Sequence, residues 1–148
     1  MPLRLTPSQV DSMFAHARAA APEECCGLLV GRREGDVSVA VEVVPSVNVW
    51  EGDRRTRFLL DPLTHLRAQR TARDRGLDIV GFYHSHPTSP PIPSVFDREM
   101  AWPGHDYVIL SLLEPPTVRN WRLGEVQAAV QSQDEQGASF HEEPLEII

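Results

Sequence analysis

A short apolar run that ends in two histidines and a group of prolines constrains this fold more than any other part of the sequence. Residues 79–83, Ile-Val-Gly-Phe-Tyr, have the composition of a buried strand. They lead directly into His84-Ser85-His86, and prolines follow at positions 87, 90, 91 and 93. Because proline interrupts helices and central strands, the strand must end here and present its last side chains beside a stiff loop.

Helix signals and strand patterns alternate along the rest of the chain. Thr6-Pro7-Ser8-Gln9 combines an N-cap, a first-turn proline and a capping-box glutamine, and Asp61-Pro62 repeats the cap-and-proline signal. We expect helices at about 7–21 and 62–75, and a short one at 94–100. Strands are expected at 25–30, 37–43, 79–83, 107–113 and 118–123, with short or edge segments at 58–60 and 140–148. These elements predict an α/β fold: a single domain with a mixed β-sheet flanked by helices.

Composition and charge exclude several classes of protein. The chain has 148 residues, enough for one domain, and its net charge of −7 disfavours a nucleic-acid partner, since phosphate binding needs a basic surface. No apolar run reaches the roughly 18 residues that span a bilayer, and the N-terminus lacks a signal-peptide core. We therefore expect no membrane partner and a cytoplasmic location. Cys25 and Cys26, the only cysteines, are adjacent and poorly placed for a disulfide or a cysteine zinc site.

The two histidines at the end of the predicted strand are candidate metal ligands. Residues i and i+2 of a strand project from one face about 6–7 Å apart, so His84 and His86 can converge on one ion. The loop that follows leads to Ser94-Val95-Phe96-Asp97, and Asp97 can turn back as a third ligand. The alternative is that Ser94 and Asp97 are only a helix-capping pair. Two imidazoles and one carboxylate would leave the fourth position of a zinc ion open, which marks a catalytic site.

An open zinc site also needs a base that takes a proton from water and delivers it to the leaving group. Glu23 and Glu24 are the leading candidates because they immediately precede the first apolar strand. The pattern of residues alone does not separate the two, and an acid at this position is ordinarily just solvated.

The order and spacing of these residues resemble a known family. His84-Ser85-His86-Pro87, six further residues and Ser94-Val95-Phe96-Asp97 are similar to the HxHP-x(6)-SxxD signature of the JAMM metalloproteases, the catalytically competent MPN proteins. The sequence from Glu24 to Leu29 resembles the family's first strand, and the segment from Asn48 to Pro62 resembles its middle part. The resemblance spans about residues 6–123 and leaves 124–148 as a C-terminal extension. It implies the cytidine-deaminase-like JAMM/MPN fold of the small stand-alone prokaryotic type.

The resemblance also implies a role for each residue of the motif. His84, His86 and Asp97 match the ligands of one catalytic Zn²⁺ ion. Glu24, rather than Glu23, matches the general acid/base, and Ser94 matches the residue that stabilises the tetrahedral oxyanion. All five are present, as in the active branch of the family, so the implied reaction is hydrolysis of an amide or isopeptide bond.

The family further implies a partner. Its members cut after the C-terminal Gly-Gly of ubiquitin or ubiquitin-like proteins, and the small prokaryotic type is associated with sulfur-carrier proteins. We expect a ubiquitin-like or sulfur-carrier protein with a Gly-Gly tail, bound by strand addition along residues 47–58, where Trp50 and nearby arginines would face it. The alternative is that 47–58 is an ordinary loop. The oligomeric state stays open, a homodimer included.

Two other functions share parts of this pattern. Zinc deaminases also combine a metal site with a glutamate, but their signature needs a downstream Pro-Cys-x-x-Cys pair, and this chain has no cysteine after Cys26. A non-catalytic MPN-type protein-binding module would keep the fold, but the complete five-residue set argues against it.

Overall fold

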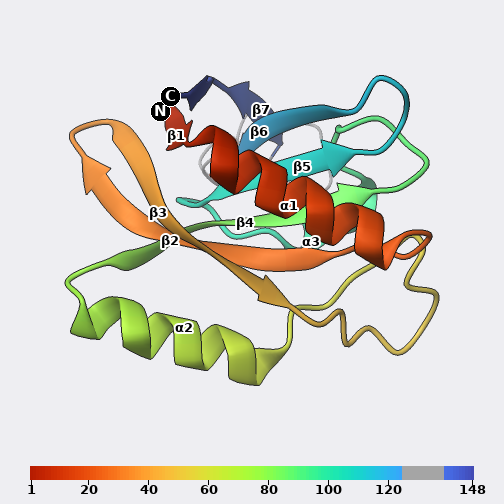
Figure 1. Cartoon of the computed structure of the whole chain (residues 1–148), viewed down its shortest axis with the longest axis horizontal. Helices are drawn as coiled ribbons and strands as arrows, with labels where there is room; N and C mark the ends of the chain where they lie inside the picture. Colours follow the sequence, from red (N-terminus) through yellow and green to blue (C-terminus); the bar gives the residue numbers. More distant parts are fainter. Residues whose placement is uncertain (125–138) are drawn as a thin grey trace.

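A curved mixed sheet forms the framework of the molecule. The computed structural model describes residues 1–124 and 139–148. Its strands are β1 (Leu3–Leu5), β2 (Cys26–Glu34), β3 (Val37–Ser46), β4 (Asp78–His86), β5 (Asp106–Ser111), β6 (Thr117–Leu123), β7 (Phe140–Glu143) and β8 (Leu145–Ile147). They lie in the order β7-β6-β5-β4-β2-β3-β1-β8, with β1–β3, β1–β8 and β4–β5 parallel. β7 and β8, the two outermost strands of this order, are consecutive in the sequence and are separated only by Pro144. The N- and C-termini lie close together (Figure 1).

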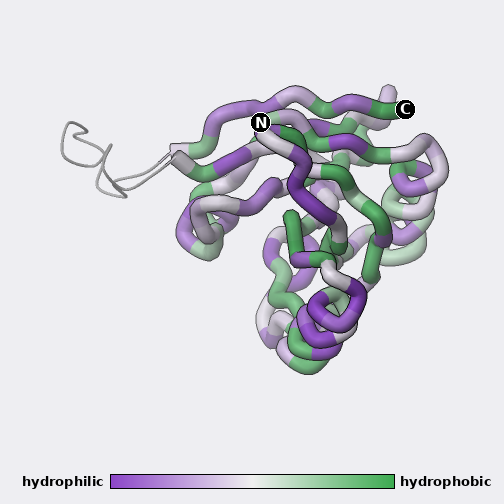
Figure 2. Tube along the Cα trace, turned by 90° about the vertical axis from the view of Figure 1, so that its left-hand side faces the viewer, coloured by the Kyte–Doolittle hydropathy of each residue, from purple (hydrophilic) through white to green (hydrophobic). Residues whose placement is uncertain are grey.

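Helices flank this sheet, and the predicted α/β fold with a mixed sheet is confirmed. The helices are α1 (Pro7–Ala20), α2 (Pro62–Asp74) and α3 (Val95–Met100), and α1 and α2 cover opposite faces (Figure 1). The predicted capping box is present: Gln9 N–H donates to the Thr6 hydroxyl at 3.1 Å, and Thr6 N–H donates to the Gln9 side chain at 2.9 Å. Hydrophilic and hydrophobic residues are mixed along α2 (Figure 2), whose Ala68 and Ala72 are buried. Within residues 1–124 and 139–148, no helix is long and apolar enough to cross a membrane.

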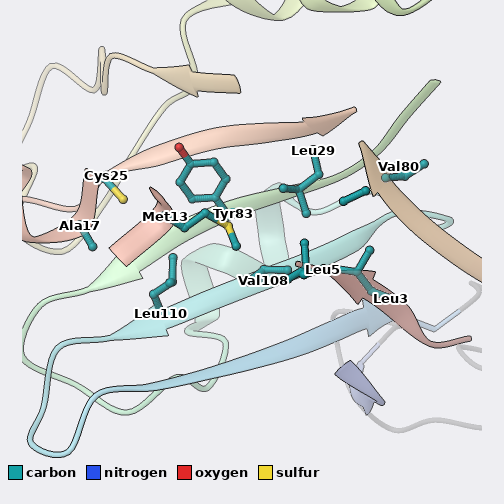
Figure 3. Packing of buried hydrophobic residues seen from close by; sticks show 11 residues of the cluster. Leu3, Leu5, Met13, Ala17, Cys25, Leu29, Val80, Tyr83, Val108 and Leu110 are labelled. Atoms are coloured by element: carbon teal, nitrogen blue, oxygen red, sulfur yellow. The ribbon is translucent and has the colours of Figure 1, made fainter. Parts of the chain in front are cut away.

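Two apolar clusters, one on each face of the sheet, hold the long helices in place. The cluster under α1 includes Met13, Tyr83 and Val108, all nearly inaccessible (Figure 3). The cluster under α2 consists of Leu28, Val30, Ala68, Ala72, Ile79 and Phe82. The central strands β2 and β4 contribute to both clusters and are therefore covered on both sides, as their apolar composition predicts.

An irregularity between β2 and β4 decides which way the end of β4 faces. The register of this pair shifts beside Leu29. Ile79 and Phe82, three residues apart, consequently both pack in the cluster under α2. Since a one-residue slip exchanges the two faces of a strand, the shift also places His84 on the α2 face, two residues beyond Phe82.

The structure departs from the sequence predictions at three short segments. β1 was not predicted. Residues 58–60 form no strand, and only Leu60 makes an isolated bridge, to Asn48. The single edge strand expected at 140–148 is divided by Pro144 into β7, which pairs with β6, and β8, which pairs with β1, because proline has no N–H to continue a ladder. Residues 125–138 of the expected C-terminal extension lie outside the described residues.

Candidate metal centre and hydrolytic site

β4 ends by placing two histidines beside the first turn of α3. His84 and His86 are 2% and 4% exposed, and Asp97 is 7% exposed. His84 Nε2 and His86 Nε2 lie 3.1 Å apart, and Asp97 Oδ2 lies 3.1 Å from the first and 3.2 Å from the second. In the part of the chain that the structure describes, these three side chains form a group able to hold a metal ion. The structure therefore brings together the three residues that the sequence singled out as ligands.

The geometry of this donor set fits a tetrahedral zinc ion. Zinc binds imidazole nitrogen and carboxylate oxygen at about 2.0–2.2 Å, so two of its tetrahedral ligands lie roughly 3.3–3.6 Å apart. The observed separations of 3.1 and 3.2 Å are close to that range. Three protein ligands also leave a fourth position for water or substrate.

The proline-rich loop fixes the orientation and tautomer of His86. The Nδ1–H of the ring donates to Pro90 O at 2.8 Å, which leaves Nε2 of the neutral imidazole free to bind a cation. The loop is itself anchored to β6, because Trp121 Nε1 donates to Pro91 O at 3.0 Å. The fold therefore fixes the ring of His86 in an orientation in which Nε2 can bind a metal ion.

Asp97 takes part in the helix cap and faces the histidines with the same oxygen. Its Oδ2 accepts the N–H of Ser94 at 2.9 Å, and its own N–H donates to Ser94 Oγ at 3.0 Å. Burial alone would raise the pKa of Asp97, but in the metal-free chain the charge of His84 and the hydrogen bonds donated by protonated His84 and His86 and by Ser94 N–H lower this pKa well below its ordinary range. The carboxylate is thus ionised, as a metal ligand must be, and the capping pair is present as well.

Glu24 is buried beside this group, whereas Glu23 is not. Glu24 is 5% exposed, while the side chain of Glu23 is 48% exposed and lies 3.5 Å from Arg54. Burial raises the pKa of Glu24 to about 7, although the nearby His84 and His86 act to lower it. Its Oε1 has no hydrogen-bond partner among the described residues. Burial and an unpaired carboxylate oxygen therefore distinguish Glu24 from the exposed Glu23.

Ser85, between the two histidines, connects the residue after Glu24 to the end of β4. Cys25 N–H donates to Ser85 Oγ at 2.8 Å, and Ser85 N–H donates to Cys25 O at 3.2 Å. This pair fixes the start of β2 against the end of β4. The sequence analysis did not single out Ser85. Its position between two candidate ligands on a strand predicts that its side chain faces the other side of the sheet from both histidines. Cys25 and Cys26 form no disulfide, as expected, and both are buried.

An apolar hollow of about 230 Å³ reaches His84 and Asp97 from the α2 side. Its walls include Phe58, Leu60, Pro62, Phe82, Met100 and Trp102. The ring of Phe58 stacks on the His84 imidazole, with centroids 4.5 Å apart and planes inclined by 23°. Phe58 was expected in a strand, and its contact with a candidate ligand was not predicted, because no local pattern brings residues 26 positions apart together.

Residues 47–58 form a loop that folds onto α3 and not the sheet edge that we expected. Trp50 packs edge-on against Phe96 of α3, with ring centroids 5.2 Å apart, and the Arg57 guanidinium lies 4.9 Å from the Phe96 centroid. Arg55 pairs with Asp53 at 2.9 Å. These side chains contact their own chain, but Arg54, Arg55 and Arg57 remain exposed, so the expectation that Trp50 and the arginines face a partner stays a prediction.

This sheet, with two buried histidines at the end of a central strand, an aspartate of α3 against them and a buried glutamate beside them, has the architecture of the JAB/MPN class of proteins. Residues 6–124 match the model of prokaryotic homologs of the JAB domain, and the chain belongs to this family. The resemblance to the JAMM family that the motif indicated is thereby confirmed.

Relatives and a solved structure agree with this assignment. The desampylase of Haloferax volcanii is 39% identical over 124 residues, which cover 80% of this chain and 87% of the relative. The CysO-cysteine peptidase of Mycobacterium tuberculosis is 32% identical over 117 residues, 77% of each chain. A solution structure of a protein from Desulfitobacterium hafniense superimposes with a TM-score of 0.79 at 34% identity, covering 100% of this chain and 93% of the other.

Proposed function

We propose that the protein is a zinc metallopeptidase that hydrolyses the peptide or isopeptide bond after the C-terminal Gly-Gly of a ubiquitin-like or sulfur-carrier protein. The observation that carries this proposal is the convergence of His84 Nε2, His86 Nε2 and Asp97 Oδ2, at 3.1 and 3.2 Å from one another, beside the buried carboxyl of Glu24. The names of the relatives, a desampylase and a CysO-cysteine peptidase, support the reaction class.

In this proposal His84, His86 and Asp97 hold one zinc ion. When bound, the ion supplies Lewis acidity, which polarises the scissile carbonyl and brings the pKa of water toward neutrality. Asp97 contributes the one negative charge among the three ligands. The hydrogen bond from His86 to Pro90 keeps that imidazole in the tautomer whose Nε2 is free.

Glu24 and Ser94 supply the proton transfer and the oxyanion contact. Glu24, buried beside the ligands with Oε1 unpaired among the described residues, accepts a proton from the attacking water and passes it to the leaving nitrogen. Ser94 Oγ accepts the N–H of Asp97 at 3.0 Å, which leaves the hydroxyl hydrogen to donate to the oxyanion. A donor of this kind contributes roughly 3 kcal/mol to transition-state stability in comparable sites.

The hollow beside the ligands is our candidate site for the tail of the substrate. It is apolar and reaches His84 and Asp97. Two consecutive glycines have no side chains, so they let the backbone of the tail approach the ligands closely. α2, which contributes to the wall of the hollow, exposes Leu63 and Leu66 and so offers an apolar face to the folded body of the partner.

Zinc analysis and a cleavage assay test this function. Purified protein should contain about one zinc per chain, should release the group that follows Gly-Gly from carrier-protein fusions, and should leave a matched fusion with Gly-Val in place of Gly-Gly intact. Glu24→Gln should keep the zinc and lose the cleavage. A protein that binds zinc and cleaves none of the fusions would be a non-catalytic binding module. Absence of stoichiometric zinc would contradict the metal site itself.

A further inference from the structure

The backbone of Glu24 is held by the loop that follows β3 and not by the sheet. β2 begins only two residues later, at Cys26. Glu24 N–H donates to Arg54 O at 2.8 Å, and Glu24 O accepts from Asn48 Nδ2 at 3.1 Å. The N–H and the C=O of this residue therefore both bond to residues 48–54. Any movement of that loop moves the candidate base.

The side-chain amide of Asn48 uses all of its hydrogen-bonding capacity to close this loop. Besides Glu24 O, Nδ2 donates to Arg57 O at 3.1 Å. Oδ1 accepts the N–H of Trp50 at 3.1 Å and the N–H of Leu59 at 3.0 Å. An amide has two donor hydrogens and two acceptor positions, and all four are occupied here. The network joins the two ends of the loop to each other and both ends to Glu24.

The same closure holds Phe58 against a candidate metal ligand. Arg57 and Leu59, the two neighbours of Phe58, are the residues that bond to Asn48. The Phe58 ring lies between them in sequence and stacks on the His84 imidazole at 4.5 Å between centroids. The stack limits rotation of the imidazole. One amide thus contacts the backbone of the candidate base and the backbone on both sides of the ring that stacks on a candidate ligand.

We propose that Asn48 is a positioning residue for hydrolysis, because its amide locks residues 48–59 into the conformation that sets Glu24 and the Phe58–His84 stack. The effect on kcat rests on the proposed function, whereas the closure of the loop by the hydrogen bonds of Asn48 does not. Asn48 acts through the carboxyl that moves the proton and through the ring of a ligand. Loss of its hydrogen bonds should therefore lower kcat more than it raises KM.

Two variants at this position distinguish a hydrogen-bonding role of the Asn48 side chain from a role in which it only fills space. Asn48→Ala removes the amide, and Asn48→Asp keeps its shape but turns an oxygen toward the carbonyl oxygens of Glu24 and Arg57. We expect kcat of the zinc-loaded enzyme to fall about 10–100-fold, with KM changed less than about threefold and with the aspartate variant the worse of the two. A residue that only fills space would give the reverse order. Val108→Ala, a truncation in the core under α1, serves as the control for general destabilisation.

Limited digestion with trypsin gives a readout that needs no substrate of the enzyme. The loop carries three cleavage sites, Arg54, Arg55 and Arg57, and proteases cut a segment when it opens locally. Cleavage at these sites, identified by fragment mass, should be about tenfold faster in both Asn48 variants and unchanged in Val108→Ala. The inference is overturned if trypsin cleaves both Asn48 variants at these sites as slowly as it cleaves the wild type. It is also overturned if the aspartate variant keeps the kcat of the wild type. If the wild type cleaves no fusion, the proposed function fails, and the trypsin comparison by itself decides whether Asn48 closes the loop.

Discussion

Replacement of Glu24 by glutamine should stabilise the metal-free protein at neutral and alkaline pH. Burial raises the pKa of Glu24 from 4.5 to about 7 in the folded chain. One pKa unit corresponds to about 1.4 kcal/mol, so ionisation of this carboxyl in the folded state costs roughly 3 kcal/mol. The folded protein keeps a proton that the unfolded chain has already released. The stability that this proton contributes is fully present below pH 4.5 and is lost as the pH rises to about 7. Glutamine has nearly the same shape and does not ionise.

Urea unfolding in EDTA at several pH values measures this effect. The unfolding free energy of Glu24→Gln should exceed that of the wild type by roughly 3 kcal/mol near pH 8 and by less than about 1 kcal/mol near pH 5. Glu23→Gln is the matched control, because it removes only an exposed ion pair with Arg54, worth less than about 1 kcal/mol. Equal differences between wild type and Glu24→Gln at the two pH values would refute the reasoning. Zinc should shrink the difference, since a nearby cation favours the ionised carboxyl.

Three further predictions concern residues around the site. Ser94→Ala should lower kcat about 100-fold or more and the unfolding free energy by about 1 kcal/mol, because it removes both the oxyanion donor and the helix cap; steady-state kinetics with unchanged kcat would exclude the oxyanion contact. Trp121→Phe removes the hydrogen bond to Pro91 O, so competition with a chelating dye should show zinc affinity reduced by up to about tenfold; unchanged affinity would mean that the prolines alone hold the loop. Burial raises the pKa of Cys25 to about 11 and that of Cys26 to about 12, so a thiol reagent near neutral pH should label neither cysteine in the folded protein and both in urea; rapid labelling without urea would contradict the burial.

Elements whose determinants are local in sequence were predictable. The capping box of Thr6 and Gln9 needs only residues three positions apart, and both of its hydrogen bonds are present. β1 and β8 have three residues each, too few to show a period, and they form because Leu3 meets Leu145 from the other end of the chain. Pairing of this kind depends on an edge that becomes available only after the rest of the sheet has formed.

The segment that ends in Phe58, Leu59 and Leu60 was misassigned for a related reason. Its composition suits a strand, but a strand also needs a neighbouring edge with free N–H and C=O groups. Here the amide oxygen of Asn48 accepts the N–H of Leu59, and Leu60 makes only an isolated bridge, to Asn48. Composition predicts that such residues are apolar and partly buried, and the hollow that they line bears this out. Composition does not predict which groups form hydrogen bonds with the backbone N–H and C=O of these residues.

The double role of Asp97 explains why a helix of six residues belongs to this site. As alternatives, a capping pair and a metal ligand each account for Ser94 and Asp97 in the sequence. In the structure one oxygen, Asp97 Oδ2, accepts the N–H of Ser94 at 2.9 Å and lies 3.1 Å from His84 Nε2. The cap fixes the rotamer of the carboxylate when the chain folds, so the ordering of this ligand does not oppose the binding of a cation. A serine and an aspartate at capping spacing after a pair of histidines are therefore no evidence against a metal site, because the cap also holds the candidate third ligand in place.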